Sequence, residues 1–209
     1  REFDVFPPGP PDLKTRYLLP GGGLSTAPAL PAPPSRYRYD PADPTPNLGG
    51  AMFAFTGAGP VWQRPVESRK DVVIFSSGPL FDDVTIIGHA EAKVFVRSSI
   101  PYADLFVRIC DVNPQGVSIN ICDGFVRTTP ETARNDDGMM EIELKLHATA
   151  HRFKQKHRIR VQVSSGAHPR FARNTGTGEP IGETTRLVPA DIEIYHDHKH
   201  RSTITLPVY

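Results

Sequence analysis

The sequence has 209 residues, with 24 Lys and Arg against 23 Asp and Glu, for a net charge of +1. This balance argues against a nucleic-acid-binding protein, which usually carries a strong basic excess on one face. No apolar run reaches 18 residues, so no segment is predicted to cross a membrane. The N-terminal Arg1-Glu2-Phe3-Asp4 has neither an initiating Met nor a signal pattern, and we expect the chain to be cut from something longer.

Prolines divide the chain into two parts. Fourteen of the 22 prolines lie in residues 1–65, and eight lie in the remaining 144 residues. Proline cannot donate to a sheet ladder and breaks helices. We therefore predict that residues 1–65 form an extended Pro-rich arm, which Tyr17-Leu18-Leu19 and Tyr37-Arg38-Tyr39 pin to the sandwich or to a missing partner domain. Residues 66–209 are predicted to form the globular domain.

After residue 70 the chain alternates between apolar and polar residues, which is typical of antiparallel strands with one buried face. The segments with this pattern are 71–75, 84–97, 105–109, 117–121, 142–148, 158–163, 192–194 and 204–208. About eight strands, with no long amphipathic helix, predict an all-β fold: a two-sheet antiparallel sandwich of the jelly-roll or galactose-binding-domain-like type.

The two cysteines flank a predicted hairpin turn at residues 113–116, Asn-Pro-Gln-Gly. A bulge at the glycine would set Cys110 opposite Asn120 and Cys122 opposite Arg108. The thiols would then share a sheet face but lie diagonally, at roughly 7–8 Å. A disulfide needs Cβ atoms within about 4.5 Å. We expect two free buried thiols, which is compatible with the cytoplasm.

A search for catalytic motifs finds no nucleophile elbow Gly-x-Ser-x-Gly. The nearest fragments, Gly23-Leu24-Ser25 and Gly116-Val117-Ser118, lack the second glycine. There is also no phosphate-binding loop and no dinucleotide fingerprint. The sequence therefore predicts no catalytic residue, no cofactor and no metal site in this chain.

Three local clusters have both a chemical and a structural interpretation. His196, His198 and His200 flank Asp197 and resemble a zinc site, but alternate strand residues lie roughly 6–7 Å apart in a row, so we favour an exposed loop with His196 hydrogen-bonded. Asp104 and Asp123 are interpreted as backbone caps rather than catalytic carboxylates. The cluster at 174–178, Asn-Thr-Gly-Thr-Gly, is interpreted as an ordinary loop, and Cys110 as a packed thiol.

An ordered set of short strings runs through the chain. They include Tyr37-Arg38-Tyr39-Asp40-Pro41 with Gly49-Gly50, Asp104-Leu105-Phe106-Val107-Arg108-Ile109, Asn120-Ile121-Cys122-Asp123-Gly124, Pro169-Arg170-Phe171 and Leu206-Pro207-Val208. Together, from about Leu18 to Tyr209, these strings resemble the C-terminal domain of the cocaine esterase / X-Pro dipeptidyl-peptidase (CocE/NonD) family of serine hydrolases. The sequence departs from the family at Lys156, where relatives tend to have a turn glycine, and at His198, where they tend to have proline.

The resemblance implies a three-part enzyme with an α/β-hydrolase domain, a helical cap and this sandwich. In such enzymes the Ser, Asp and His of the triad belong to the hydrolase domain, so this chain alone is expected to be inactive. In such enzymes the sandwich packs on the hydrolase domain and helps wall the substrate cleft, and the resemblance implies the same for this chain. The substrate of the parent enzyme would be a small ester, an amide or an Xaa-Pro peptide.

The cleft-facing residues are predicted in the segment after the Gly-Gly pair. An apolar run there, with Met52 and Phe53 as the candidate wall, could face an acyl group. The alternative, equally weighted, is that these side chains pack under the arm, and Trp62 has the same two interpretations. For the whole chain, the alternative functions are a free-standing carbohydrate-binding module or an assembly module that forms a homo-oligomer.

Overall fold

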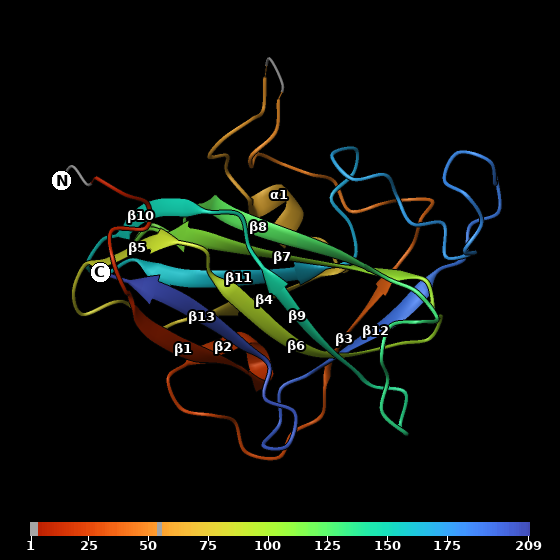
Figure 1. Ribbon diagram of the computed structural model, residues 1–209, viewed down its shortest axis with the longest axis horizontal. Coiled ribbons are helices and arrows are strands. Elements are labelled where there is room, and N and C mark those ends of the chain that lie inside the picture. Colours follow the sequence, from red (N-terminus) through yellow and green to blue (C-terminus); the bar gives the residue numbers. More distant parts are fainter. Residues whose placement is uncertain (1–3, 54–55) are drawn as a thin grey trace.

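A computed structural model describes residues 4–53 and 56–209 of the chain (Figure 1). The described residues form thirteen strands and two short helical segments. No helix among them is long and apolar enough to span a membrane. The elements in chain order are β1 (Asp12–Leu19), the 3-10 turn Pro20–Gly22, β2 (Gly23–Ser25), β3 (Ser35–Tyr39), α1 (Arg64–Glu67), β4 (Val72–Ser76), β5 (Val84–Gly88), β6 (Glu91–Ser98), β7 (Ala103–Val112), β8 (Ser118–Thr128), β9 (Met140–Lys145), β10 (Thr149–Phe153), β11 (Arg158–Ser164), β12 (Ala190–Tyr195) and β13 (Thr203–Val208).

The strands form an antiparallel β-sandwich, which confirms the predicted fold class. One layer has the order β4-β11-β7-β8, and the other contains β3-β12-β6-β13-β1, with β9 beside β6. A single parallel bridge between Gly23 of β2 and Ser76 of β4 links the two layers. The apolar side chains between the layers form one core, since residues of β1, β6, β7, β11, β12 and β13 belong to the same cluster of buried hydrophobics.

The Pro-rich segment before residue 66 contributes three strands. β1 pairs with β13 from Asp12 to Tyr17, and the whole of β3, Ser35 to Tyr39, pairs with Ala190 to Ile194 of β12. The fourteen prolines of this segment lie outside its strands, where no ladder donor is required. Leu18 and Tyr37 point into the core. These two residues lie on β1 and β3, which pair with β13 and β12 of the rest of the sheet.

Two predictions of strand pattern are wrong in detail. The single strand expected over 84–97 is two strands, because the chain bends at Gly88, which has a φ of +118°. The outer face of β7 was expected to be solvated, yet Phe106 and Arg108 are 3% and 1% exposed. Both side chains are covered by loops from elsewhere in the chain.

The register of the β7–β8 hairpin is also different from the prediction. Cys110 lies opposite Asn120 as expected, but Arg108 lies opposite Asp123 rather than Cys122. The cause is an irregularity between Ile109 and Cys110, where β8 carries one extra residue. From that point β8 is shifted by one position, so its side chains exchange faces.

Candidate functional site

The feature that stands out from the sandwich is a projecting loop, residues 47–63, of which 47–53 and 56–63 are described (Figure 1). Its two legs are joined near the base by a pair of backbone hydrogen bonds between Gly50 and Gly59, at 2.8 and 3.0 Å. The second leg runs along the edge of β8. There Trp62 forms an isolated β-bridge with Ile119, and the backbone amide of Gln63 donates to the Ser118 carbonyl at 2.9 Å. α1 follows directly.

The predicted cleft-wall residues lie on the first leg of this loop. Phe53 is fully exposed, at 103% of its reference area. Met52 is half-buried, and its Sδ accepts a hydrogen bond from Asn47 Nδ2 at 3.2 Å. Trp62, on the second leg, is 46% exposed. Phe53 is therefore not packed against the described residues, whereas the hydrogen bond of Met52 holds it against the base of the loop.

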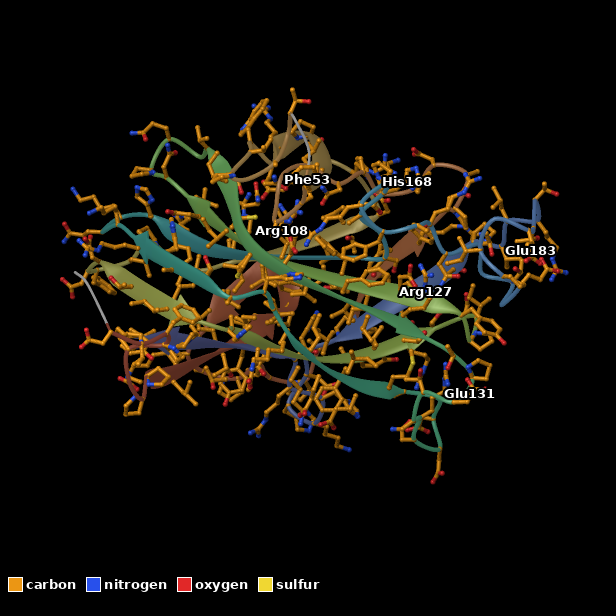
Figure 2. All side chains as sticks on the ribbon, turned by 45° about the horizontal axis from the view of Figure 1, so that its top comes forward. Phe53, Arg108, Arg127, Glu131, His168 and Glu183 are labelled. Atoms are coloured by element: carbon orange, nitrogen blue, oxygen red, sulfur yellow. The ribbon has the colours of Figure 1, made fainter. Side chains whose placement is uncertain are left out.

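Beneath the loop lies a buried polar network centred on Arg108, which projects from the outer face of β7 (Figure 2). Its Nη1 donates to the Leu48 carbonyl at 2.7 Å and to Gln63 Oε1 at 3.0 Å. Its Nη2 donates to Asn47 Oδ1 at 2.9 Å. One guanidinium thus binds both legs of the loop, in an environment where an unpaired charge would be costly.

The negative charge in the network comes from Asp123 of β8. Its Oδ2 accepts from Arg108 Nη2 at 3.0 Å, and its Oδ1 accepts from Arg170 Nη1 at 2.8 Å. The side chains of Asp123 and Arg108 are 2% and 1% exposed. The bulge in β8 produces this pairing, because the regular register would put Cys122 opposite Arg108 and turn Asp123 toward the core. Asp123 is therefore an ion-pair partner and not the backbone cap that was predicted.

The remaining contacts of the network are made by two amide side chains. Gln63 Nε2 donates to the Leu48 and Val61 carbonyls at 3.0 and 2.8 Å. Asn120 accepts from the Val61 amide at 2.7 Å and donates to the Gly59 carbonyl at 3.0 Å. The loop base is thus fixed to the sheet by side chains as well as by its own backbone.

Asp104 is buried and forms a second ion pair further along the same two strands, with a partner, Arg127, whose side chain is 31% exposed. Arg127 of β8 binds both of its carboxylate oxygens at 2.8 Å, and Asn174 Nδ2 donates to it at 2.8 Å. The loop 174–178, which was interpreted as ordinary, thus supplies a buried side chain that bonds to β7. The prediction of a backbone cap at Asp104 is also wrong, and no acid–base pair forms because Asp104 and Asp123 are held by separate arginines.

The histidine cluster does not converge on one point. His196 is 2% exposed, and its Nε2 lies 2.9 Å from Ser35 Oγ. Its Nδ1 has no hydrogen-bond partner in the described part of the chain. His198 is exposed, while His200 bonds Asp197. No group of three His, Cys, Asp or Glu side chains within 4–53 and 56–209 is arranged to hold a metal. His198 lies on an exposed loop, as predicted, whereas His196 is buried.

The two thiols are free and buried, as predicted. They do not share a sheet face, however. Cys122 of β8 pairs with Ile109 of β7, and both side chains face the core. Cys110 follows Ile109 on β7, so its side chain points to the opposite face of the sheet. Burial raises the pKa of both thiols, that of Cys122 to about 12, so neither is an activated nucleophile.

Sequence reasoning did not find Arg108, Gln63, Asn120 and Arg170 as a unit, because they lie on four segments with no common motif. One signal was available. β7 is apolar on both faces over most of its length, which is unusual for a strand with a solvated side and indicates a covered outer face.

Comparisons with known proteins agree with this architecture. Residues 1–205 match the family described as the X-Pro dipeptidyl-peptidase C-terminal non-catalytic domain. The chain is 38% identical over 197 residues to the cocaine esterase of Rhodococcus sp. (strain MB1 Bresler), which covers 90% of this chain and 34% of that protein.

Two solved structures are similar over nearly the whole chain. An α-amino acid ester hydrolase superposes with a TM-score of 0.83 at 26% identity, covering 94% of this chain and 36% of the other. An aminopeptidase from a marine sediment Thaumarchaeota archaeon superposes with a TM-score of 0.85 at 23% identity, covering 100% and 38%, and it shows the fold alone. This chain spans about a third of the length of each relative. By the family match over almost all of its length, the chain is a member of the X-Pro dipeptidyl-peptidase C-terminal non-catalytic domain family, found in CocE/NonD-type hydrolases.

Proposed function

We propose that this chain acts as the accessory domain of a longer serine hydrolase, stabilising an upstream α/β-hydrolase domain and helical cap and forming one wall of their substrate cleft. The observation that carries the proposal is the projecting loop. Phe53 is a fully exposed aromatic side chain on a loop whose base is held by buried hydrogen bonds. Exposed aromatic side chains on a fixed support are typical of binding surfaces.

The reacting groups would come from the upstream domains, and the substrate class would be a small ester, an amide or an Xaa-Pro peptide. Relatives of this chain carry the names of an esterase, an ester hydrolase and an aminopeptidase, and each is about three times as long. Met52 and Phe53 would contact the acyl part of the substrate, with Met52 hydrogen-bonded to Asn47 and the Phe53 side chain fully exposed.

A carbohydrate-binding module is not favoured by the described surface. The hollow of about 390 Å³ on the face of β6, β9 and β13 is lined by Lys, Glu, Thr, Ala and Leu side chains and has no aromatic platform. Stacking on aromatic side chains is the usual basis of sugar recognition on such a face.

The first experiment compares this chain with the full-length protein that contains it, using p-nitrophenyl acetate and butyrate and a serine-reactive phosphonate. We expect the full-length protein to turn over and to be labelled, and this chain to do neither. Turnover or labelling of this chain alone would contradict the proposal, and the labelled residue would identify the site.

The second experiment tests the cleft wall with Phe53→Ala in the full-length protein. We expect the ratio of kcat/KM for butyrate over acetate to change, because one missing apolar contact changes discrimination by about 10-fold or more. Phe81→Ala is the matched control, since Phe81 is 91% exposed on the loop between β4 and β5 and has no role in the proposal. An unchanged ratio for Phe53→Ala would remove the projecting loop from the cleft.

A further inference from the structure

The hydrogen bonds of Arg108 differ from those of an ordinary buried ion pair, because most of them go to the projecting loop rather than to the sheet. Its guanidinium binds Asn47, Leu48 and Gln63, all within the loop, in addition to Asp123. A salt bridge that only stabilised β7 and β8 would need the carboxylate alone. The planar fork of arginine is used here to join a loop to a sheet.

The glycine pair shows how closely the loop is seated on this network. Gly49 and Gly50 have φ values of +73° and +96°, in the region that favours glycine. A Cβ on Gly50 would lie 2.9 Å from Arg170 Nη1, 2.9 Å from Asp123 Oδ2 and 3.3 Å from Arg108 Nη2. The backbone of the loop therefore touches the charged groups directly, without side chains between them.

The distance along the chain between the network and the exposed aromatic is short. Gly50 is three residues before Phe53, and the Gly50–Gly59 backbone pair lies between the network and the outer part of the loop. A change in the guanidinium position is therefore transmitted to Phe53 through only a few backbone bonds. The network thus fixes the backbone at the base of the loop, from which the exposed Phe53 side chain extends.

We propose that Arg108 is a positioning residue for acyl selectivity: through Asp123 and the Gly49-Gly50 backbone it fixes the projecting loop in the orientation that presents Phe53 to the substrate. This inference rests on the proposed function, because it assigns the determinant of that same cleft wall. Arg108 does not touch substrate and acts only through the loop.

The chain itself offers a readout of loop position, because Trp62 is its single tryptophan and lies on the second leg. The test variant is Arg108→Lys, which keeps the positive charge beside Asp123 but cannot bind Asn47, Leu48 and Gln63 together. We expect acrylamide quenching of Trp62 to increase about twofold and amide exchange in 47–63 to accelerate about tenfold, as a released loop opens locally.

The matched control is Arg127→Lys. Arg127 forms an ion pair with the buried Asp104 on the same two strands, at a distance along the sheet from the loop (Figure 2). Its side chain is 31% exposed, and its hydrogen bonds among the described residues go to Asp104 and Ala172, not to 47–53 or 56–63. We expect this variant to lower the melting temperature while leaving Trp62 quenching unchanged. An equal effect of both variants on Trp62 would overturn the proposal, since general destabilisation would then explain the loop signal.

In the full-length protein the same variants separate the two proposals. We expect Arg108→Lys to change the butyrate-to-acetate ratio of kcat/KM about tenfold, through KM for the larger acyl group, because displacements of about 1 Å have effects of this size. If Phe53→Ala changes the ratio and a folded Arg108→Lys does not, the positioning role is wrong and the cleft wall stands. If Phe53→Ala has no effect, the cleft wall itself fails.

A variant within the loop keeps the test decisive if Arg108→Lys does not fold. Gly50→Ala places a methyl group against Arg170 and Asp123 and leaves every residue of the sheet unchanged. The same increase in Trp62 quenching and the same change in acyl selectivity are expected. A folded Gly50→Ala protein with the original quenching and selectivity would overturn the proposal.

Discussion

Lys156 lies in the turn between β10 and β11 with a φ of +69°, the left-handed region that favours glycine. Its amide donates to the Leu80 carbonyl at 2.9 Å, which fixes the turn in this conformation. A side chain with a Cβ costs roughly 1 kcal/mol or more in this region. The resemblance to the family had already marked this position, since relatives tend to have glycine there.

We therefore expect Lys156→Gly to raise the free energy of unfolding by about 0.5–1 kcal/mol, once the greater chain entropy of glycine is subtracted. Lys156→Ala is the matched control, because it removes the charge and the long side chain but keeps the Cβ. Urea unfolding followed by circular dichroism measures both. A gain of the same size in Lys156→Ala would assign the effect to the side chain and not to the backbone.

The burial of His196 predicts that the stability of the molecule depends on pH. Burial lowers the pKa of the imidazole, and its Nδ1 has no partner within the described residues. The native state therefore binds fewer protons than the unfolded state, where the pKa is about 6.5. The stability due to the neutral ring is fully present above that value and is lost as the pH falls below it, with a slope of at most about 1.4 kcal/mol per pH unit.

We expect His196→Gln to reduce the loss of unfolding free energy between pH 7.5 and pH 5.5, measured by urea denaturation. Ser35 keeps a hydrogen-bonding partner in this variant. The control is His198→Gln, because His198 is exposed on the same loop. If the two variants show the same pH dependence as the original chain, buried His196 is not the source of acid sensitivity.

Among the elements, β1 shows how the Pro-rich segment contributes to stability. Leu18 is 2% exposed and belongs to the core, whereas Leu13, on the same strand, is 64% exposed. We expect Leu18→Ala to lower the free energy of unfolding by about 2–5 kcal/mol, as buried Leu→Ala substitutions do. Leu13→Ala should change it by less than about 0.5 kcal/mol. Equal small effects, measured by urea unfolding, would mean that β1 is not part of the cooperative core.

Most strands of the second part were predictable because alternation of apolar and polar residues is a local property, but β10 (Thr149–Phe153) lies in none of the predicted segments. β1 and β3 were less accessible, since their partners β13 and β12 lie more than a hundred residues away and proline-rich stretches surround them. The β8 bulge was not predictable, because one extra residue in a pairing leaves no mark in the sequence of either strand. That bulge moved Asp123 to Arg108 and separated the two thiols.

At the scale of the whole molecule, the predicted division into a Pro-rich arm (1–65) and a globular domain (66–209) has a direct test. The segment before it shares the core with the rest, through Leu18, Leu24, Tyr37 and Tyr39. We expect the urea transitions followed by Trp62 fluorescence and by far-ultraviolet circular dichroism to coincide, as for one cooperative unit. A Trp62 transition at lower urea would mean that the Pro-rich segment unfolds separately.

The sequence by itself determined the all-β sandwich, the free thiols and the family, and it pointed to Met52 and Phe53. These follow from local periodicity, composition and an ordered set of short strings. Only the tertiary structure decided that Arg108 is buried under the projecting loop and that Asp104 and Asp123 belong to separate ion pairs. The physical reason is that burial and charge pairing depend on which distant segments cover a strand. A loop such as 47–63 has no periodicity from which its position can be read.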